Sequence, residues 1–532
     1  MRNWNPVNQF SAIRLQRSGR TVRRAVLLHG LAGLLALTAT SCSRAPDPHT
    51  LVMIIESSPT NLDPRVGLDA QSQNIGSLLF ENLLARDEKL SVKPGLADRW
   101  ERPDPTTYVF HLHPGLTFSD GRPLTSRDVK WSYDSLIEGK IRSAKGATYR
   151  LVRNIEAPDA ATVTFHLKQP WAALLWNLCA PGMGIVPYGS GPEISSNPIG
   201  SGPFRFVSAE QDKEVILERN DRYWGERAKL ARIRFTVVPD TTTRALELRK
   251  GSADLELNAL TPDMEAALGH EPQLRVMRAP GTRLGYLAFN LRDPILKEVR
   301  VRQAIAYAVD RQPLMHYLWR DSVRPAASVL PPESWAYDAA VRQYPHDPVR
   351  ANQLLDSAGY TARNGLRFHL TMKTSTEESS RAMAAVFQQQ LREVGIALDI
   401  RSYEPATFFS DVTHGAFQVY SLRWLGANED PDIFEYAFSS TRIIPNGANR
   451  QYYNNPRVDQ LVAQAGSELD QNARKRDYAE IQRILAEDLP YIYLWYFDNV
   501  MVHSGRVRNV KLNPSGDYEF LRTAELARAK GF

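Results

Sequence analysis

The stretch Ile233–Leu257, which reads IRFTVVPDTTTRALELRKGSADLEL, has the pattern of a strand, a helix and a second strand. Ile233–Val238 is rich in apolar and β-branched residues, which predicts the first strand. Thr241–Lys250 predicts a helix that ends at Gly251, and Asp254–Leu257 predicts the second strand. Units of this kind build parallel sheets that are covered by helices.

The same unit recurs about 130 residues further along the chain. Arg367–Met372 predicts a strand, Ser380–Val394 a helix that stops at Gly395, and Ala397–Ile400 another strand. Apolar residues lie at helical spacing on one face of that helix, namely Met383, Val386, Phe387, Leu391 and Val394. Two such units predict an α/β fold with two lobes, each containing a parallel sheet. Binding sites on such sheets lie at strand ends or between lobes.

A β-rich section precedes these units. Thr107–His113 and Thr162–Leu167 alternate apolar and polar residues, as half-buried strands do. A chain of 532 residues is also too long for one compact core, so two or three domains are expected. We therefore expect a small β-rich domain besides the two lobes.

The positive charge of the chain is confined to its beginning. The net charge is +6, and residues 1–41 contain six arginines and no acidic residue. The rest of the chain has as many basic as acidic residues, so we expect no nucleic acid as a partner.

The apolar run Ala25–Leu37 has the length of a signal-peptide core and is shorter than a membrane span. It leads into Ala39-Thr-Ser-Cys42, which resembles a bacterial lipobox, although the usual leucine is Ala39 here. We expect a signal peptide at 1–41, lipidation of Cys42 and a lipidated tether at 42–48. An ordinary secretory signal is the alternative, and Arg23-Arg24 leaves the export route open between Sec and twin-arginine.

No pattern in the sequence predicts catalysis or a bound metal. We find no serine elbow, no HExxH and no CxxC. His111 and His113 share one face of a predicted strand, but no third ligand accompanies them. Cys179 is the only cysteine besides Cys42, so lipidation of Cys42 would exclude a disulfide. We expect no enzyme activity, no cofactor and no metal site.

A series of ordered motifs runs from about Leu51 to the C-terminus and resembles the extracellular solute-binding proteins of the peptide and nickel group, the periplasmic components of ABC importers. The motifs are Lys93–Trp100, Tyr108–Val129, Asn197–Phe204, Arg219–Trp224, Gly251–Asp254, Val299–Asp310 and Gln451–Asp459.

This resemblance implies a clamshell of the type II periplasmic-binding-protein class, with two α/β lobes plus a small extra β-rich domain. Lobe I would comprise 49–75, 196–285 and 499–532, the extra domain 76–195, and lobe II 286–498. The chain crossings near Asn290 and Asp498 would form a hinge, and the ligand would be enclosed between the lobes.

The resemblance also singles out the stretch Arg423–Asp432, RWLGANEDPD. In the peptide-binding relatives, an aspartate that pairs with the α-amino group of the ligand stands where this chain has Ala427. Asp430 is interpreted as the start of a helix, with Pro431 behind it. Glu429 fits either that helix start or a replacement for the missing acid. Trp424 offers a flat face to a peptide plane or a cation, or fills the core.

Two more regions are predicted to line the cleft. In the peptide-binding relatives, the backbone that corresponds to Ser57–Asn61 pairs with the main chain of the ligand. The aromatic run Tyr491–Tyr496 would place Tyr491, Tyr493 and Trp495 on one face if its residues alternate strictly. The predicted ligand-binding residues are Ser57, Ser58, Asn61, Arg423, Trp424, Gly426, Ala427, Asn428, Glu429, Tyr493 and Trp495.

The sequence thus predicts a monomeric, lipid-anchored binding protein of the periplasm that delivers a peptide or peptide-like small solute to ABC permease subunits and their ATPase. Main-chain pairing tolerates varied side chains, which favours peptides. The missing aspartate leaves a metal chelate, a sugar or an opine-like metabolite as alternatives. A lipoprotein sensor or periplasmic chaperone without a transport role is the alternative from another class.

Overall fold

The computed structural model describes residues 47, 49–87, 91–179, 182–424 and 430–527. The chain divides into two units, Met1–Asp47 and Pro48–Phe532, and every element below belongs to the second. Cys42 lies outside the described residues. Among the residues that the structure describes, no helix has the length and apolar character needed to cross a membrane.

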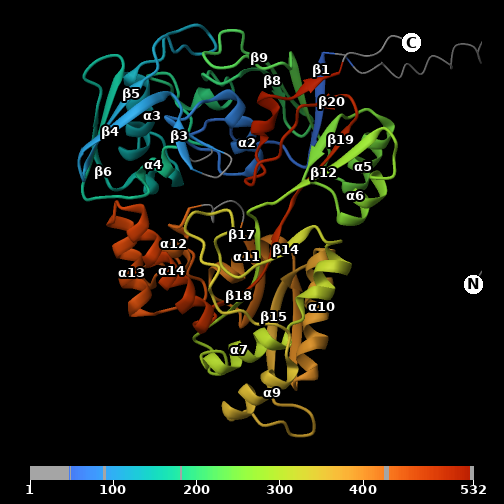
Figure 1. Ribbon diagram of the computed structural model, residues 1–532. Coiled ribbons are helices and arrows are strands. Elements are labelled where there is room, and N and C mark those ends of the chain that lie inside the picture. The colour runs from blue at the N-terminus through green and yellow to red at the C-terminus, as the bar shows by residue number, and fades with distance from the viewer. Residues whose placement is uncertain (1–46, 48, 88–90, 180–181, 425–429, 528–532) are drawn as a thin grey trace, which may run out of the picture. The chain divides into compact units, whose positions relative to one another are not determined.

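The first large sheet of this unit has seven strands (Figure 1). Their order is β12 (Leu274–Ala279), β19 (Asn499–Ser504), β11 (Leu255–Leu257), β1 (Thr50–Ile55), β10 (Arg232–Val237), β9 (Glu214–Arg219) and β8 (Phe204–Glu210). Successive residues of β1 enter different cores, as strand geometry requires. Leu51, Met53 and Ile55 belong to a cluster with α2 (Ala70–Leu79), whereas Ile54 packs with Leu248 of α5 (Thr241–Lys250). The short helix α6 (Pro262–Leu268) adds to the second cluster.

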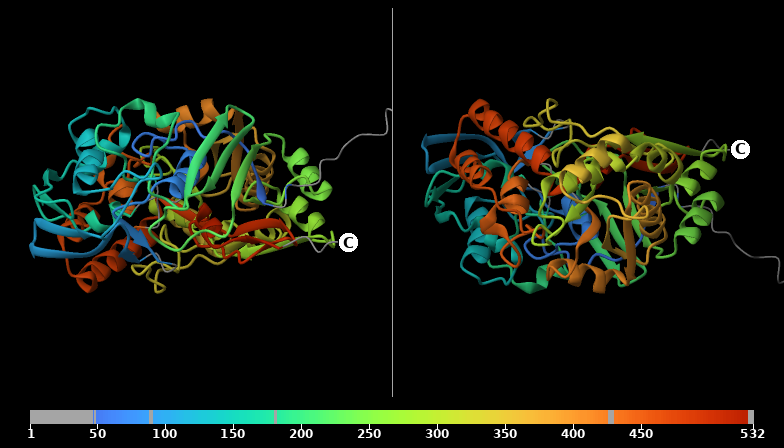
Figure 2. Two further views of the ribbon diagram at one scale, coloured as in Figure 1. Left: turned by 90° about the horizontal axis from the view of Figure 1, so that it is seen from above. Right: turned by 90° about the horizontal axis from the view of Figure 1, so that it is seen from below.

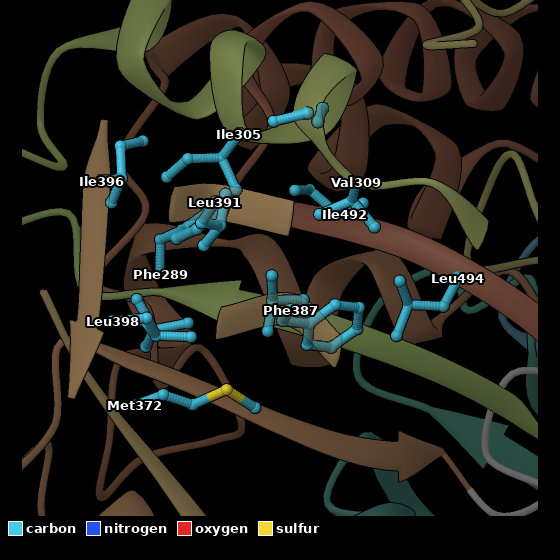
Figure 3. Close-up of a cluster of buried hydrophobic side chains, with 14 of the residues drawn as sticks. Phe289, Ile305, Val309, Met372, Phe387, Leu391, Ile396, Leu398, Ile492 and Leu494 are labelled. Carbon is cyan, nitrogen blue, oxygen red and sulfur yellow. The ribbon is translucent and has the colours of Figure 1, made fainter. Parts of the chain in front are cut away.

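The second large sheet has six strands. Their order is β14 (Val323–Pro325), β18 (Tyr491–Phe497), β13 (Leu284–Phe289), β17 (Val419–Trp424), β15 (Phe368–Ser375) and β16 (Ile396–Tyr403). Helices α7 (Val299–Ala308), α9 (Pro348–Ser357) and α10 (Glu378–Glu393) cover one face. Figure 3 shows this core, where Phe387 and Leu391 of α10 lie among Met372 and Leu398 of the sheet. The predicted apolar face of that helix is confirmed.

Helices α11 (Pro405–Thr413), α12 (Ile433–Phe438), α13 (Pro456–Ser467) and α14 (Gln471–Asp488) contribute to the cluster on the other face. The remaining short elements are α8 (Arg311–Pro313), η3 (Leu314–Leu318), η4 (Ser440–Arg442), η5 (Tyr518–Arg522) and the two-stranded pairs β2 (Leu84–Arg86) with β3 (Val92–Pro94) and β20 (Val507–Arg508) with β21 (Glu525–Leu526).

A separate antiparallel sheet forms the predicted β-rich section. It contains β4 (Ala97–Asp104), β5 (Thr107–Leu112), β7 (Thr162–Leu167) and β6 (Val152–Glu156), packed with α3 (Ser126–Ile137), α4 (Leu174–Asn177), η1 (Ala144–Tyr149) and the segment before η2 (Pro192–Ser195). Figure 2 shows this sheet in blue and teal with α13 beside it, and the backbone N–H of Ala172 donates to the carbonyl of Gly466 at 3.0 Å.

The prediction of two parallel sheets is wrong in one respect, because both large sheets are mixed. β1 pairs in parallel with β10 and β11, while β9 and β19 join antiparallel. In the second sheet, β15 is parallel to β16 and β17, but β13 is antiparallel to both of its neighbours. A strand–helix–strand pattern predicts only that its own two strands are parallel. The other strands of each sheet come from hairpins or from distant parts of the chain, and these can join antiparallel.

The chain passes between the two large sheets at two places that lie side by side. Residues 280–283 connect β12 to β13, and Asp498 alone separates β18 from β19. The first passage therefore precedes Asn290. Nη2 of Arg283 donates to the Asp498 carbonyl at 3.1 Å and to Oδ1 of Asn258 at 2.9 Å, which ties both passages to the end of β11.

Candidate functional site

A cavity of about 360 Å³ lies on the six-stranded sheet, beside the N-terminal end of α10. It is lined by strands β13, β17 and β18, by the first turns of α10 and α11, and by the segment that contains Trp319. Most of the lining is apolar, and its aromatic members are Trp319, Phe408, Phe409, Trp495 and Phe497. An apolar cavity with a few polar groups is the usual form of a small-molecule site.

One cross-strand row forms the floor of the cavity. Arg423 of β17 is opposite Gly285 of β13, and Gly285 is opposite Trp495 of β18. Because residues in such a row project to the same face, only the glycine separates the side chains of Arg423 and Trp495. A Cβ atom at Gly285 would stand 2.9 Å from Nε1 of Trp495, so only a glycine lets the indole lie this close to β13.

The orientation of Trp495 depends on a β-bulge that sequence periodicity does not reveal. Gly285 pairs with Trp495 but Tyr286 pairs with Tyr493, so Leu494 is an extra residue in β18. Tyr491 and Tyr493 therefore pack in one core, while Leu494 and Trp495 lie in the core on the other face. The strict alternation predicted for Tyr491, Tyr493 and Trp495 is wrong at Trp495.

Arg423 brings a positive charge to the cavity. Its Cζ lies 4.7 Å from the ring centre of Phe497 and 5.3 Å from that of Trp319. Among the described residues, no hydrogen bond or ion pair engages its guanidinium, and the negative charge of Glu377 acts on it only at a distance. The low-polarity surroundings lower the pKa of Arg423 from its ordinary value, because they disfavour the charged form.

A second arginine adds positive charge close by. The Cζ of Arg283 lies 5.8 Å from the ring centre of Phe497, the same ring that Arg423 contacts. Burial, followed by the charge of Arg423, lowers the pKa of Arg283 to about 10. The Nε of Arg283 is buried without a hydrogen-bond partner in the part of the chain that the structure describes. The two guanidinium groups therefore repel each other across one aromatic ring.

The indole N–H groups of Trp319 and Trp495 also lack acceptors. Both Nε1 atoms are buried, and neither has a hydrogen-bond partner among the described residues. Besides Arg423, the polar lining consists mainly of hydroxyl groups of Ser375, Ser379, Ser380 and Ser421, and Glu377 is the one carboxylate in the lining that the structure describes.

The predicted residue Trp424 lies on the opposite face from Arg423. It is 7% exposed and packs in the core with Tyr286, whose ring is stacked on it at 6.1 Å. The guanidinium of Arg450 lies 5.5 Å from its ring centre. Tyr493 is buried in the same core. Neither Trp424 nor Tyr493 is part of the cavity lining.

The predicted residues after β1 lie outside the cavity lining. Ser57 is exposed, and Oγ of Ser58 accepts the backbone N–H of Asp212 at 2.8 Å. The N–H of Asn61 donates to Oγ of Ser72, and its Oδ1 accepts from the N–H of Asp63. These hydrogen bonds shape the loop between β1 and α2.

Four further predicted residues, Gly426, Ala427, Asn428 and Glu429, lie outside the described residues. Asp430 is described, and its Oδ1 accepts the N–H of Asp432 at 2.8 Å just before α12 begins at Ile433. The helix therefore begins two residues later than the predicted cap and proline would place it. Burial raises the pKa of both Asp430 and Asp432, and the charge of Asp430 raises the pKa of Asp432 further.

Sequence analysis missed Trp319, Phe497, Glu377 and Gly285 as parts of the site. Phe497 directly continues the aromatic run Tyr491–Tyr496, so extending that run by one residue would have included it. Trp319 and Glu377 carry no comparable signal, because only the sheet brings them next to β18. Among the described residues, no group of histidine, cysteine, aspartate and glutamate side chains could hold a metal ion.

Comparison with known proteins identifies the family. Residues 91–446 match the family described as bacterial extracellular solute-binding proteins, family 5 middle. The chain is 25% identical over 516 residues to the dipeptide-binding protein of Escherichia coli K12, covering 91% of this chain and 96% of that protein. It is 27% identical over 511 residues to heme-binding protein A of Haemophilus influenzae, covering 90% and 93%.

Solved structures agree with this assignment. The oligopeptide-binding protein AppA of Bacillus subtilis, in complex with a nonapeptide, matches with a TM-score of 0.75 and 26% identity, covering 90% of this chain and 99% of that one. The chain belongs to family 5 of the bacterial extracellular solute-binding proteins. It is a substrate-binding protein of the kind that serves ABC transporters, and the predictions of the fold class and of a binding protein without enzymatic activity are confirmed.

Proposed function

We propose that the protein is the substrate-binding lipoprotein of an ABC importer and that it captures a peptide or peptide-like solute for a membrane permease. The observation that carries this proposal is the aromatic cavity beside Arg423, within a chain that matches family 5 over most of its length. Relatives of similar identity are named for dipeptides and for heme, so family membership alone leaves the solute open.

Capture would involve both large sheets. We propose that lobe I (49–75, 196–285 and 499–532) and lobe II (286–498) close on the solute, with residues 76–195 as an extra domain. The passages at 280–283 and at Asp498 are short and adjacent, which suits a hinge. In this arrangement Ser57, Ser58 and Asn61 would approach the solute from lobe I, and Arg423 and Trp495 from lobe II.

A lipid anchor on Cys42 would keep the protein at the membrane, next to its permease. Two or three acyl chains bury enough CH₂ groups for stable attachment, whereas one chain is marginal. The Cys42→Ser variant should appear in the soluble periplasmic fraction. A wild-type protein that is itself wholly soluble would contradict the anchor.

The solute can be tested by native mass spectrometry of the protein purified from its own host. We expect a bound small solute with peptide-like composition, released on unfolding. Calorimetry with free and N-acetylated forms of one dipeptide then measures the affinity. A protein that carries no solute and binds neither form would contradict a role in peptide uptake.

A further inference from the structure

We propose that the cavity on the six-stranded sheet binds its solute through an anionic oxygen group, a carboxylate or a phosphate, held by the guanidinium of Arg423 next to a flat apolar part of the same solute. This inference rests on the proposed binding function and specifies the chemistry of the solute.

The first argument is the missing partner of Arg423. The side chain of Arg423 is exposed, so its guanidinium donors stay open to water or to a solute, whereas an arginine that the fold itself uses is paired with acceptors. Arg506 is an arginine of the second kind, because its Nη2 donates to Oδ2 of Asp254 at 2.7 Å. Within the described part of the chain, Arg423 has only aromatic rings next to its guanidinium. A planar guanidinium binds carboxylate and phosphate oxygens in a two-pronged manner, so an anionic group is its natural complement.

The second argument is the charge balance around the cavity. Arg283 adds a further positive charge beside Phe497, and Glu377 is the single carboxylate among the described lining residues. Glu377 forms no ion pair with Arg423 within the described structure; its Oε2 accepts from Oγ of Ser380 at a long 3.5 Å. An anionic solute would relieve the repulsion between the two arginines, whereas a cationic solute would increase it.

The third argument is the shape and polarity of the walls. Trp319 and Phe497 meet edge to face at 4.9 Å, and Trp495 completes an aromatic wall around the guanidinium. Gly285 lets the indole of Trp495 lie directly against β13, in the same cross-strand row as Arg423. A flat apolar group fits against such rings while its acidic group meets Arg423.

The size of the cavity limits the part of the solute that it holds. A volume of about 360 Å³ is near the lower end of the range of about 300–1,000 Å³ for small-molecule sites. We therefore expect it to hold one aryl-sized group and one acidic group, with any remaining part of the solute extending toward the seven-stranded sheet.

Three probes that share a phenyl ring test this inference by calorimetry: N-acetylphenylalanine, its uncharged amide, and phenyl phosphate. We expect wild-type protein to bind the acid about tenfold or more tightly than the amide, and the Arg423→Met variant to lose this preference. The Arg392→Met variant is the matched control. Arg392 is exposed at the other end of α10, and its loss should leave the preference unchanged. Tighter binding of phenyl phosphate than of the acid would assign a phosphate group, and the reverse a carboxylate.

Each other outcome would overturn the inference. Equal binding of acid and amide, a preference that survives Arg423→Met, or no binding of either anionic probe at millimolar concentration would each show that Arg423 is no anion anchor. An equal loss for acid and amide in Arg423→Met would instead assign Arg423 to contacts between the lobes. In all of these cases, a solute released from the wild-type protein in the mass-spectrometry experiment would leave the proposed function intact.

Discussion

Two arginine sites of this protein differ in every respect that matters for their role. Arg65 is fully buried, and all of its guanidinium nitrogens have acceptors. Nε and Nη2 bind Asp63 at 3.0 and 2.8 Å, and the remaining donors reach Oγ of Ser135 and the carbonyls of Ser190 and Gly191. Arg423 is exposed, lies over two aromatic rings, and has no such acceptor among the described residues.

The difference separates scaffold from site. Arg65 connects the loop after β1 to α3 and to the backbone before η2. All of its donors are therefore bonded within the fold, and none remains for a solute. Arg423 leaves its donors available, so its charge can act on a solute. If burial alone were used to find functional residues, the buried Arg65 would be chosen before the exposed Arg423. Whether a charged group already has hydrogen-bond partners within the fold is the better guide to function.

The largest effect should come from Arg65→Met. Removing the guanidinium leaves Asp63 buried without its partner, which typically costs about 3–5 kcal/mol of unfolding free energy. Urea unfolding followed by circular dichroism would measure the loss, with Arg392→Met as the exposed control. A change no larger than that of the control would show that the buried pair is dispensable and would remove the basis of the comparison.

Glu256 lies between the two arginines in how well its charge is paired, and it should make the stability of the protein depend on pH. It is fully buried in β11; Oε2 accepts the N–H of Ala259 at 2.8 Å, while Oε1 has no partner within the described structure. Burial, with a smaller contribution from Glu265, raises its pKa to about 8. The native state therefore holds a proton that the unfolded state releases above about pH 4.5, so stability should fall between about pH 4.5 and 8 and then level off.

The Glu256→Gln variant should lose this contribution, on the order of a few kcal/mol over that pH range. Urea midpoints at pH 5 and pH 8 for both proteins provide the measurement. If the urea midpoint changes equally between pH 5 and pH 8 in wild type and variant, another group causes the pH dependence. Glu265, whose pKa is raised to about 7, would be the first such group to test.

Ala427→Asp tests the prediction, drawn from the family resemblance, that an acid at this position would hold the α-amino group of a peptide; Ala427 lies outside the described residues. A carboxylate there should raise the affinity for a free-amine dipeptide over its N-acetylated form by about tenfold, or 1.4 kcal/mol. Calorimetry on the matched pair measures it. If wild-type protein already prefers the free amine by that factor, another acid, Glu429 first among them, holds the ammonium group.

The smallest effect should be that of Arg423→Met on stability. Because the guanidinium has no acceptor in the described structure and faces Arg283, its removal should change the unfolding free energy by about 0.5 kcal/mol or less. The same urea experiment applies. A loss close to that of Arg65→Met would mean that Arg423 supports the fold, and the two arginine sites would no longer differ.

Local patterns account for much of the fold that could be predicted. The helix predicted at Thr241–Lys250 has those bounds in the structure, and the predicted strand at Thr162–Leu167 does as well. Gly251 and Gly395 adopt the left-handed backbone conformation that their predicted helix-end positions require. These features depend on neighbours in sequence, so periodicity and backbone sterics reveal them.

The sequence by itself determined the two strand–helix–strand units, the β-rich section, the family and the candidate status of Arg423 and Trp495. Only the tertiary structure decided that both large sheets are mixed and that Trp495 shares a face with Arg423 rather than with Tyr493. It also brought Trp319, Gly285 and Phe497 to one cavity. The physical reason is that strand pairing, a single bulge residue and the absence of a partner for a charge depend on residues that are distant in sequence, about which a local pattern carries no information.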